Sequence, residues 1–361
     1  MIKLLCIVGG MNTGGAETFL MKIYRELPHD KYQMDFCVTN EKEGFYDKEI
    51  EKLGGKIIHI TKKSKNIIKN FKEIEDIVKI GKYNNVIRIS QHSLSALDLY
   101  AAKRGGARNL IFRSSNSNSC GSWLNRIMHK VFKVFAKKIP NVKIAPSDVA
   151  AIHMFGRKDY EQGKVKILNN GLPIQNFMYN SKKRDEIRKK LKIEDKFVIG
   201  HIGRFTKQKN HQFLIDVFND YLAINENSLL LLIGEGELKK SIERYIEKKK
   251  IKDKVLFLGL IGNAYEMYNA MDCFVFPSLF EGMPNTVIEA QTNGLNCIIS
   301  DKITTNVKLT NKVEFLPLEN SKTWAKEIRV SINREKDYSI IKEKGYDIND
   351  VTKEFVKLCY K

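Results

Sequence analysis

Short apolar segments alternate with amphipathic segments of helical length along most of the chain. The apolar segments before residue 150 are 4–8, 33–39, 56–60, 86–89, 109–112 and 143–145. Those after residue 195 are 197–201, 229–233, 255–258, 273–276 and 296–299. Helical patterns, such as those at 17–27 and 67–79, fill the intervals. This alternation is typical of βαβ units, so we predict an α/β fold with two successive doubly wound parallel sheets.

A segment rich in Gly, Pro, Asn and Ser at 171–181 separates the two predicted sheets and is typical of a linker. The length of 361 residues also favours two domains over one. We therefore expect an N-terminal domain at 1–172 and a C-terminal domain at 178–345. Residues 347–361 begin with a capping Asp347 and carry spaced apolar side chains, which predicts a terminal helix.

Two acidic residues, Glu281 and Glu289, lie eight positions apart between two predicted strands. Glu281 is in a loop with Gly282 and Pro284, and Glu289 is predicted to lie two turns into the following helix. The N-terminus of such a helix attracts anions through its free N–H groups and its dipole. Ionised carboxylates accept several O–H bonds. The pattern therefore predicts a ligand with hydroxyl groups at two ends and a phosphate between them, as in a nucleotide sugar.

This acidic segment resembles the Glu-x7-Glu motif of retaining glycosyltransferases of the GT-B fold, family 4. Further segments similar to motifs of this family are Gly14-Gly15-Ala16-Glu17, Asn169-Asn170-Gly171, the basic loop from Gly200 to Asn210, and Gly234-Glu235-Gly236-Glu237-Leu238. They occur in the order that the family shows and cover nearly the whole chain. Within the family, 280–301 is most similar to the enzymes that build bacterial capsules and exopolysaccharides.

The resemblance implies a GT-B fold, in which two Rossmann-like domains face each other across a cleft. The N-terminal domain would bind the acceptor, and the C-terminal domain would bind the nucleotide-sugar donor. The last helix, with 346–361, would cross back to the N-terminal domain. The implied reaction is retaining transfer of a hexose from a nucleoside-diphosphate sugar to a lipid-linked glycan, with a UDP-sugar as the expected donor. Its expected setting is the biosynthesis of a bacterial capsular, exopolysaccharide or other cell-surface polysaccharide.

The resemblance also assigns roles to individual residues. Glu281 would hold the donor sugar, and the cations Arg204 and Lys209 would stabilise the charge that develops on the diphosphate. Lys207 competes with Lys209 for this role, and His92 is the fourth catalytic candidate. The expected donor-binding residues are Gly14, Gly15, Arg113, Gly203, Gly236, Asn263, Gly282, Met283, Pro284, Asn285, Thr286 and Glu289. Glu289 would bind the ribose hydroxyls, and the paired glycines would let the backbone approach a phosphate.

One segment departs from the family pattern. The family usually has a histidine after the fourth or fifth strand of the N-terminal domain, where this chain has Arg113-Ser114-Ser115. We expect Arg113 to contact the donor phosphate or an anionic acceptor. His92 follows the preceding predicted strand and matches another family histidine, and both a structural and a catalytic role stay open for it.

The sequence contains no Asp-x-Asp triplet. Glycosyltransferases of the other main fold use such acids to hold a metal ion on the diphosphate. Here the cations and the helix N-termini are expected to supply the countercharge. We therefore expect no metal and no cofactor other than the nucleotide-sugar co-substrate.

Residues 123–138 form a basic amphipathic pattern. Its apolar positions are Leu124, Ile127, Met128, Val131 and Phe135, and its basic positions are Arg126, Lys130, Lys133 and Lys137. We expect the apolar face to pack on the sheet of its own domain and the basic face to approach anionic lipid. Insertion into a membrane interface is the alternative. Residues 1–175 hold 30 Lys and Arg against 16 Asp and Glu, which also favours an anionic partner surface.

Two other functions are alternatives to the glycosyltransferase hypothesis. A UDP-sugar epimerase can use a similar two-domain scaffold. The net charge of +20 suggests nucleic-acid binding as the second alternative. Against it, the sequence has no zinc-finger pattern, no aromatic RNA-binding motif and no long basic tail.

The chain also gives expectations about its location. No apolar segment approaches the ~20 residues of a membrane helix, so we expect a cytoplasmic protein with peripheral contact at the inner face of the membrane. The six cysteines form no metal-binding pattern and are expected to be buried, reduced thiols.

Overall fold

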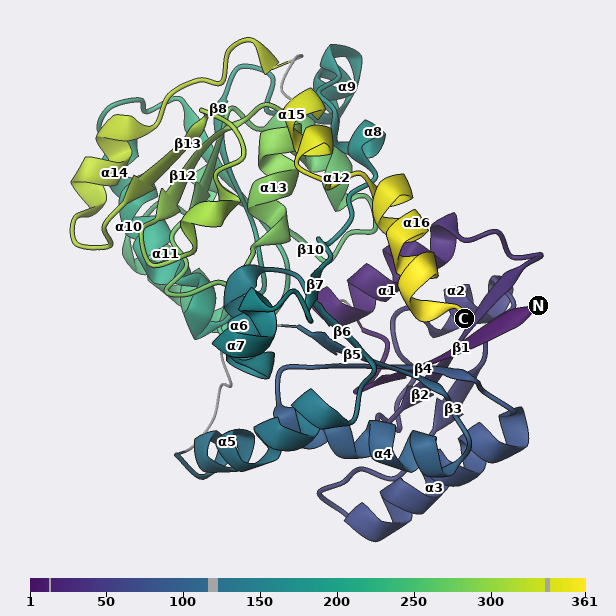
Figure 1. Ribbon diagram of the computed structural model, residues 1–361. Coiled ribbons are helices and arrows are strands. Elements are labelled where there is room, and N and C mark those ends of the chain that lie inside the picture. Colours follow the sequence, from purple (N-terminus) through teal and green to yellow (C-terminus); the bar gives the residue numbers. More distant parts are fainter. Residues whose placement is uncertain (13, 116–122, 335–337) are drawn as a thin grey trace. The chain divides into compact units, whose positions relative to one another are not determined.

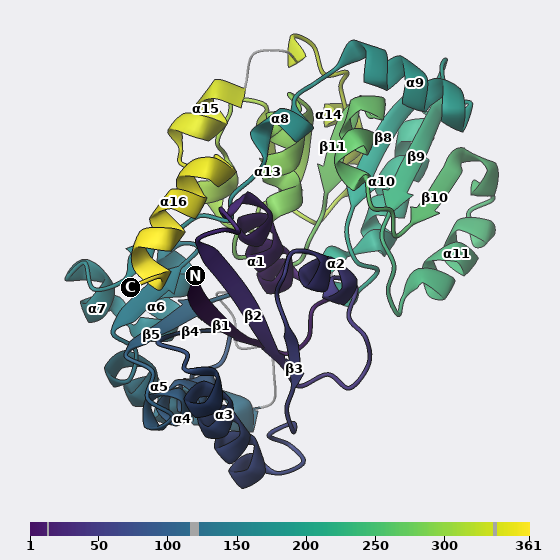
Figure 2. The same ribbon diagram turned by 90° about the vertical axis from the view of Figure 1, so that its right-hand side faces the viewer.

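The computed structural model describes residues 1–12, 14–115, 123–334 and 338–361. The chain forms two compact units, of which unit 1 consists of Met1–Leu172 and Gly345–Lys361, and unit 2 of Pro173–Lys344. Both are α/β units built on parallel sheets, as Figure 1 and Figure 2 show. The predicted fold class is confirmed. The chain passes between the units inside the predicted linker and passes back just before the terminal helix.

Within the described residues, unit 1 contains a seven-stranded parallel sheet in the order β3-β2-β1-β4-β5-β6-β7. Its strands are β1 (Ile2–Val8), β2 (Tyr32–Val38), β3 (Ile57–His59), β4 (Asn85–Ser90), β5 (Asn109–Ser114), β6 (Val142–Ala145) and β7 (Lys166–Ile167). The strand order changes direction between β1 and β4. In doubly wound sheets, ligands bind outside the carboxyl ends of the strands at this point.

Helices cover both faces of the unit 1 sheet. They are α1 (Gly15–Glu26), α2 (Asp47–Lys52), α3 (Ile67–Gly81), η1 (Ser93–Ser95), α4 (Ala96–Arg104), α5 (Trp123–Lys138), α6 (Asp148–Phe155), α7 (Arg157–Glu161) and α16 (Ile348–Cys359). Leu4 and Cys6 of β1 belong to the hydrophobic core shared with α1 and α16, whereas Leu5 and Ile7 belong to the core shared with α3 and α4. This division follows because successive side chains of a strand point to opposite faces.

The terminal helix α16 completes unit 1. The Asp347 side chain caps it by accepting a hydrogen bond from the Asn349 N–H. Phe355 of α16 packs edge-on against Phe19 of α1, with ring centroids 5.9 Å apart. Figure 1 and Figure 2 both show these two helices side by side. The predicted return of the C-terminal helix to the N-terminal domain is therefore confirmed.

Unit 2 repeats the topology of unit 1, with a parallel sheet in the order β10-β9-β8-β11-β12-β13. Its strands are β8 (Phe197–Ile202), β9 (Ser228–Ile233), β10 (Val255–Gly259), β11 (Cys273–Phe276), β12 (Asn296–Ser300) and β13 (Val313–Leu316). Its helices are α8 (Ile174–Phe177), α9 (Ser181–Leu191), η2 (Lys207–Lys209), α10 (His211–Leu222), α11 (Lys239–Lys248), η3 (Lys252–Lys254), α12 (Ala264–Met267), η4 (Tyr268–Ala270), α13 (Asn285–Thr292), η5 (Thr305–Val307), α14 (Ser321–Glu327) and α15 (Tyr338–Glu343). The switch point of this sheet lies between β8 and β11.

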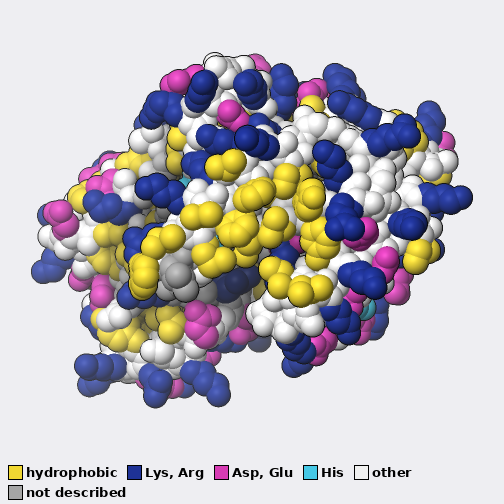
Figure 3. Space-filling view, turned by 60° about the horizontal axis from the view of Figure 1, so that its bottom comes forward, with side chains coloured by type: hydrophobic (Ala, Val, Ile, Leu, Met, Phe, Trp, Pro, Cys, Tyr) yellow, Lys and Arg dark blue, Asp and Glu magenta, His cyan; other side chains and the backbone are white. Residues whose placement is uncertain are grey.

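Helix α5 corrects one expectation, because its apolar face does not pack on the sheet. Among its described side chains, those that it buries are His129 and Ala136, on a narrow strip. The exposed apolar side chains are Trp123, Ile127, Val131, Val134 and Phe135. Figure 3 shows hydrophobic side chains gathered on the side of the molecule that carries α5, with Lys and Arg around them. Periodicity revealed an amphipathic helix but not which of its faces meets the core. Leu124, another predicted apolar position of this helix, has a side chain that lies outside the described structure.

The cysteine prediction is confirmed for the cysteines that the structure describes. Cys6, Cys37, Cys273, Cys297 and Cys359 are free and buried. Cys120 lies outside the described residues. Within the described ranges, no helix is both long enough and apolar enough to cross a membrane.

Candidate active site

The loops that follow β8 and β11 bring a cation and an acid together at the switch point of unit 2. Lys209 Nζ, at the end of η2, donates to Glu281 Oε1 at 2.7 Å. Both side chains are largely buried, and Lys209 Nζ also lies 4.5 Å from the ring centroid of Phe276. The pair therefore stands in a partly desolvated environment, where charges interact more strongly than in water.

The two loops are also joined through Gln208. Its side-chain amide donates to the Phe280 carbonyl at 2.9 Å, and its backbone carbonyl accepts the Leu279 N–H at 2.8 Å. These bonds set the register of the loop that carries Lys209 against the loop that carries Glu281. The competing cation, Lys207, is exposed and has no ion pair within the described residues.

Arg204 follows directly after β8 and is exposed at the carboxyl end of the sheet. Within the described part of the chain, its guanidinium makes no hydrogen bond and no ion pair. A cation that is held at this edge without an internal partner is available to an anionic ligand. Arg204 and Lys209 therefore differ, because the first is open to solvent and the second is already paired with an acid.

Glycines allow the β9 loop to pack directly against the β8 loop. Gly234 has a φ of +141°, and a Cβ there would lie 2.2 Å from the Gly203 carbonyl oxygen. A Cβ on Gly236 would lie 2.5 Å from the Phe205 carbonyl oxygen. The Phe205 N–H in turn donates to the Glu235 carbonyl at 3.0 Å. The predicted glycines are thus required for close contact between backbones, whether or not they also touch a ligand.

Glu289 is the fifth residue of α13, about one turn into the helix rather than the predicted two. Its Oε2 lies 2.9 Å from the hydroxyl of Tyr268, which is fully buried. The same hydroxyl lies 3.2 Å from the Thr286 carbonyl oxygen. Burial is the main reason why the pKa of Tyr268 is raised well above its usual value, and the Glu289 carboxylate raises it further. Tyr268 therefore stays protonated and orients the carboxylate.

The segment Gly282–Thr286 leads into α13, whose N-cap is Pro284. Asn285 is the first helical residue, and the helix has no side-chain cap at this end. The hydroxyl oxygens of Thr286 and Ser278 are buried without a hydrogen-bond partner among the described residues. A helix N-terminus with uncapped N–H groups suits an anion or a sugar hydroxyl. Met283 is partly exposed beside it.

Asn263 lies at the N-cap of α12 and is exposed. Its side-chain amide donates to Glu266 Oε2 at 2.7 Å, so this donor is already engaged within the helix. The neighbouring β10 ends at Gly259, whose carbonyl accepts the Gly234 N–H at 3.0 Å. The β8, β9, β10 and β11 loops thus all lie at the carboxyl edge of one sheet.

Two buried histidines stand behind the cation loop. His201 Nδ1 lies 2.8 Å from the Val275 carbonyl oxygen. A Cβ added to Gly203 would lie only 2.8 Å from His201 Nε2. His211 stacks on Phe205 with ring centroids 4.2 Å apart, and neither of its ring nitrogens has a partner within the described structure. Burial lowers the pKa of His201 to about 4 and that of His211 to about 2. Both rings are therefore neutral at pH 7.

These histidines predict a specific pH dependence of stability. A histidine whose folded pKa is lowered stabilises the fold above its usual pKa of about 6.5, and this stability is lost as the pH falls. For His211, the loss between pH 7 and pH 5 is expected to be about 2 kcal/mol. Thermal unfolding at both pH values should show a smaller loss in His211→Leu than in the parent. An equal loss in both proteins would contradict the prediction.

In unit 1, Gly14 and Gly15 follow β1 and stand at the start of α1. Gly14 is the N-cap of α1, and Gly15 is its first residue. A Cβ on Gly14 would lie 2.3 Å from Glu17 Oε2, whereas a Cβ on Gly15 would meet no atom within 4 Å. A side chain on Gly14 would thus displace only the flexible end of Glu17, and Gly15 leaves the start of α1 open.

Arg113 is only 1% exposed, so its surface is not open to a ligand in this conformation. Its Nη2 donates to Asn170 Oδ1 at 2.6 Å and to the Leu168 carbonyl at 3.4 Å. Its guanidinium carbon lies 3.7 Å from the ring centroid of Phe19. No described carboxylate pairs with it, and burial lowers its pKa to about 9. The side chain joins β5 and α1 to the last segment before unit 2.

Substitution of Arg113 by methionine separates a structural role from a ligand role. Burial of an unpaired guanidinium is unfavourable, so Arg113→Met is expected to raise the free energy of unfolding by about 1 kcal/mol or more. Chemical denaturation measures this change. If Arg113 also contacts the donor phosphate, the KM for the donor will rise in the same variant. An unchanged KM would remove Arg113 from the donor site.

His92 is partly exposed, and both of its ring nitrogens are engaged. Nδ1 accepts the Leu94 N–H at 3.1 Å, so the ring proton lies on Nε2, which donates to the Asn125 carbonyl at 2.9 Å. The ring therefore joins the loop after β4 to the first turn of α5. To polarise a sugar, His92 would have to give up one of these bonds.

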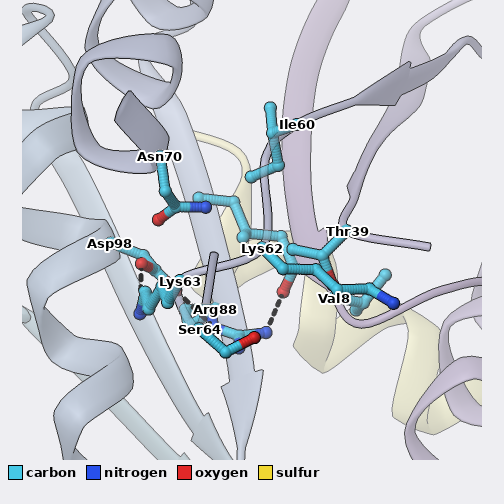
Figure 4. Close-up of a pocket in the computed structure, with 10 residues that line it drawn as sticks. Val8, Thr39, Ile60, Lys62, Lys63, Ser64, Asn70, Arg88 and Asp98 are labelled. Atoms are coloured by element: carbon cyan, nitrogen blue, oxygen red, sulfur yellow. Dashed lines mark hydrogen bonds and ion pairs between the residues drawn. The ribbon is translucent and has the colours of Figure 1, made fainter. Parts of the chain in front are cut away.

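Unit 1 also contains a cavity of about 300 Å³ near the carboxyl ends of β1, β2 and β3. Asp98 forms ion pairs with Lys63 at 2.5 Å and with Arg88 at 2.8 Å. Figure 4 shows these three side chains close together at the cavity. Arg88 also donates to the Ile7 and Ile89 carbonyls. Most of the charge in this cavity is thus paired internally and connects β1, β4 and α4.

Comparisons with known proteins decide the family. Residues 183–348 match the family model described as "Glycosyl transferases group 1". The Bacillus subtilis protein EpsF, which is named as a glycosyltransferase, is 30% identical over 84% of this chain and 80% of its own length. The chain belongs to the group 1 glycosyltransferases.

Other relatives of this glycosyltransferase align over most of its length. The Staphylococcus aureus capsular polysaccharide biosynthesis glycosyltransferase CapH is 28% identical over 99% of this chain and 98% of its own. The Escherichia coli UDP-Gal:alpha-D-GlcNAc-diphosphoundecaprenol alpha-1,3-galactosyltransferase is 25% identical over 70% and 68%. The crystal structure of Anabaena HepE with UDP-glucose matches with a TM-score of 0.79, at 16% identity and 99% coverage of both chains. This likeness supports the GT-B fold.

Sequence reasoning missed some residues of this glycosyltransferase's site. Tyr268, Gln208 and the buried pair His201 and His211 lie outside the acids and cations on which the motifs depend. Gln208 and His201 lie within the basic loop that was recognised, but their contacts reach β11 and the loop after it and could not be inferred from spacing. Among the described residues, no group of three or more His, Cys, Asp or Glu is placed to hold a metal ion.

Proposed function

We propose that this glycosyltransferase transfers a hexose from a UDP-sugar, with retention of anomeric configuration, to a lipid-linked glycan. The product would contribute to a bacterial capsule, exopolysaccharide or other cell-surface polysaccharide. The names of the relatives support this setting, because CapH is named for capsular polysaccharide and the E. coli relative for a UDP-galactose donor and a diphosphoundecaprenol acceptor. The UDP-glucose complex of HepE supports the same class of donor.

The observation that carries the proposal is the charge arrangement at the switch point of unit 2. Lys209 is held by Glu281, Arg204 has no ion pair among the described residues, and the N-terminus of α13, which has no side-chain cap there, follows the loop that carries the acid. Two cations and a helix N-terminus suit the diphosphate of the donor. Glu281 suits the hydroxyls of the donor sugar, and Glu289 suits the hydroxyls of the ribose.

The chemistry follows from these positions. As the bond between sugar C1 and the diphosphate oxygen breaks, negative charge grows on UDP, and Arg204 and Lys209 stabilise it. The acceptor hydroxyl attacks C1 from the face that UDP leaves, and the hydroxyl proton passes to the departing diphosphate oxygen. The new glycosidic bond then has the configuration of the donor. In this scheme the countercharge comes from side chains and helix dipoles, and no metal is required.

The first experiment is thermal unfolding with a panel of nucleotides and nucleotide sugars in EDTA. A ligand present at 100 times its dissociation constant is expected to add about 2.7 kcal/mol to stability. We expect UDP and one UDP-hexose to stabilise the protein and other nucleotides to have little effect. Loss of the effect in EDTA and its return with Mn²⁺ would contradict the metal-free proposal.

The second experiment identifies the reaction. NMR of the product formed from the stabilising UDP-hexose and an undecaprenyl-diphosphate-linked saccharide should show the anomeric configuration of the donor. An inverted product would overturn the retaining mechanism. Formation of an epimeric UDP-sugar without any acceptor would instead favour the epimerase.

A further inference from the structure

Helix α5 presents an apolar face to solvent. Four of its apolar residues recur at the spacing of successive turns, namely Trp123, Ile127, Val131 and Val134, and their exposed fractions are 68%, 47%, 58% and 50%. At about 100° per residue, these positions share one side of the helix. Phe135, 42% exposed, extends the same side. A contiguous exposed group of this kind is typical of an interaction surface rather than of a solvated helix.

The apolar side of α5 is bordered by positive charge. Arg126 and Lys130 are exposed, Lys137 and Lys138 end the helix, and the sequence of α5 contains neither Asp nor Glu. Arg126, Lys130 and Lys137 lie one turn or two apart, on a strip next to the apolar side rather than behind it. The partner must therefore combine an apolar interior with an anionic surface. An anionic lipid bilayer has this combination, with acyl chains beneath charged headgroups.

The opposite side of α5 is held firmly to the rest of unit 1. The Ser93 hydroxyl donates to the His129 carbonyl at 2.6 Å, and the Ser93 N–H donates to His129 Nδ1 at 3.2 Å. His129 also stacks on His153 of α6 with ring centroids 4.6 Å apart. Lys133 Nζ donates to the Ile152 carbonyl at 3.1 Å. The exposed side is thus presented by an anchored helix and requires no rearrangement to meet a surface.

We propose that α5 docks this glycosyltransferase on an anionic membrane, with Trp123, Ile127, Val131 and Val134 in the interface and the exposed Arg126 and Lys130 on the lipid phosphates. The inference rests on the proposed function in one respect, because a lipid-linked acceptor would be presented at such a surface.

The chain contains its own reporter for this test. Of its two tryptophans, Trp123 is 68% exposed and Trp324 is fully buried. Insertion of α5 should shift the emission of Trp123 to shorter wavelength and make it accessible to brominated lipid. The full-length protein is mixed, without nucleotide, with vesicles of phosphatidylcholine alone or with an equal share of phosphatidylglycerol. We expect binding and a spectral shift with the anionic vesicles, and weaker binding at high salt.

Paired substitutions test the two components of docking by vesicle co-sedimentation. Arg126→Gln with Lys130→Gln should lower the partition coefficient about 25-fold, at roughly fivefold for each charge near the surface. Ile127→Gln with Val134→Gln should lower it roughly tenfold or more. All four side chains are exposed, so thermal unfolding should be unchanged.

Matched controls come from exposed residues of unit 2. Lys189→Gln with Lys190→Gln removes the same charge, and Ile224→Gln with Ile332→Gln removes similar apolar area. Both control proteins should bind vesicles like the parent. Equal weakening by the control and α5 pairs would overturn the proposal, as would no binding to anionic vesicles. Self-association in solution that shields Trp123 would assign the surface to a second copy instead. Stabilisation by UDP is measured separately on each variant, so failure of docking and failure of the donor site are distinguishable.

Discussion

Lys209→Ala is expected to lower kcat about 10²–10³-fold, because it removes a preplaced cation from the diphosphate as negative charge develops there. The effect should fall mainly on kcat rather than on KM, since the charge on the leaving group is greatest in the transition state. The substitution also leaves Glu281 without the ammonium group that lies 2.7 Å from its Oε1. Steady-state kinetics with the UDP-hexose identified by thermal unfolding measures the change.

The chain offers a matched control two positions away. Lys207 belongs to the same short helix, but it is exposed and unpaired among the described residues. Lys207→Ala removes the same charge from the same loop and is expected to leave kcat within about twofold of the parent. If Lys207→Ala lost as much activity as Lys209→Ala, the role assigned to the Lys209–Glu281 pair would be wrong. Thermal unfolding of both variants would show whether lost stability explains lost activity.

Glu289→Ala is expected to weaken binding of UDP about 10–100-fold, because hydrogen bonds to a charged acceptor contribute about 1.5–3 kcal/mol each. The loss should be similar for UDP and for the UDP-hexose, since the ribose is common to both. Calorimetric titration with UDP measures it. Glu281→Ala should differ, with weaker binding of the UDP-hexose and little change for UDP.

Two further variants test whether UDP binding depends on the Tyr268 hydroxyl that orients the Glu289 carboxylate. Tyr268→Phe removes the hydroxyl 2.9 Å from Glu289 Oε2 and is expected to weaken UDP binding by a smaller factor, about threefold to tenfold. Glu226 is exposed and precedes β9, at the amino edge of the same sheet. Glu226→Ala should bind UDP like the parent. Unchanged UDP binding in Glu289→Ala would contradict the ribose assignment.

The fold was largely predictable because each strand of these sheets is a short apolar run between helical patterns. The predicted strand at 197–201 differs from β8 by one residue, and the predicted strand at 273–276 coincides with β11. The carboxyl ends of parallel strands lie at the same edge of a sheet. The predicted strand directions therefore also placed Arg204, Lys209 and Glu281, in the loops after two strands, at one edge of the sheet.

The parts that could not be predicted depend on contacts between distant segments. Tyr268 is about twenty positions from Glu289, and no spacing rule relates a tyrosine to an acid on the next helix. Arg113 was expected to contact a ligand because it replaces a histidine, yet Phe19 and Asn170 surround it. The α5 pattern gave the correct helix, but the same periodicity fits a buried and an exposed apolar face.

The discontinuity of unit 1 has a consequence for synthesis on the ribosome. Unit 2 is a single stretch of chain, whereas unit 1 needs residues 345–361 to cover the part of its core that includes Leu4, Cys6 and Phe19. Unit 1 is therefore begun before unit 2 and completed after it, and unit 2 can fold while the α1 face of unit 1 is still uncovered. During that interval the apolar side chains of β1 and α1 lack the cover that α16 provides, and transiently exposed apolar surface of this kind favours aggregation.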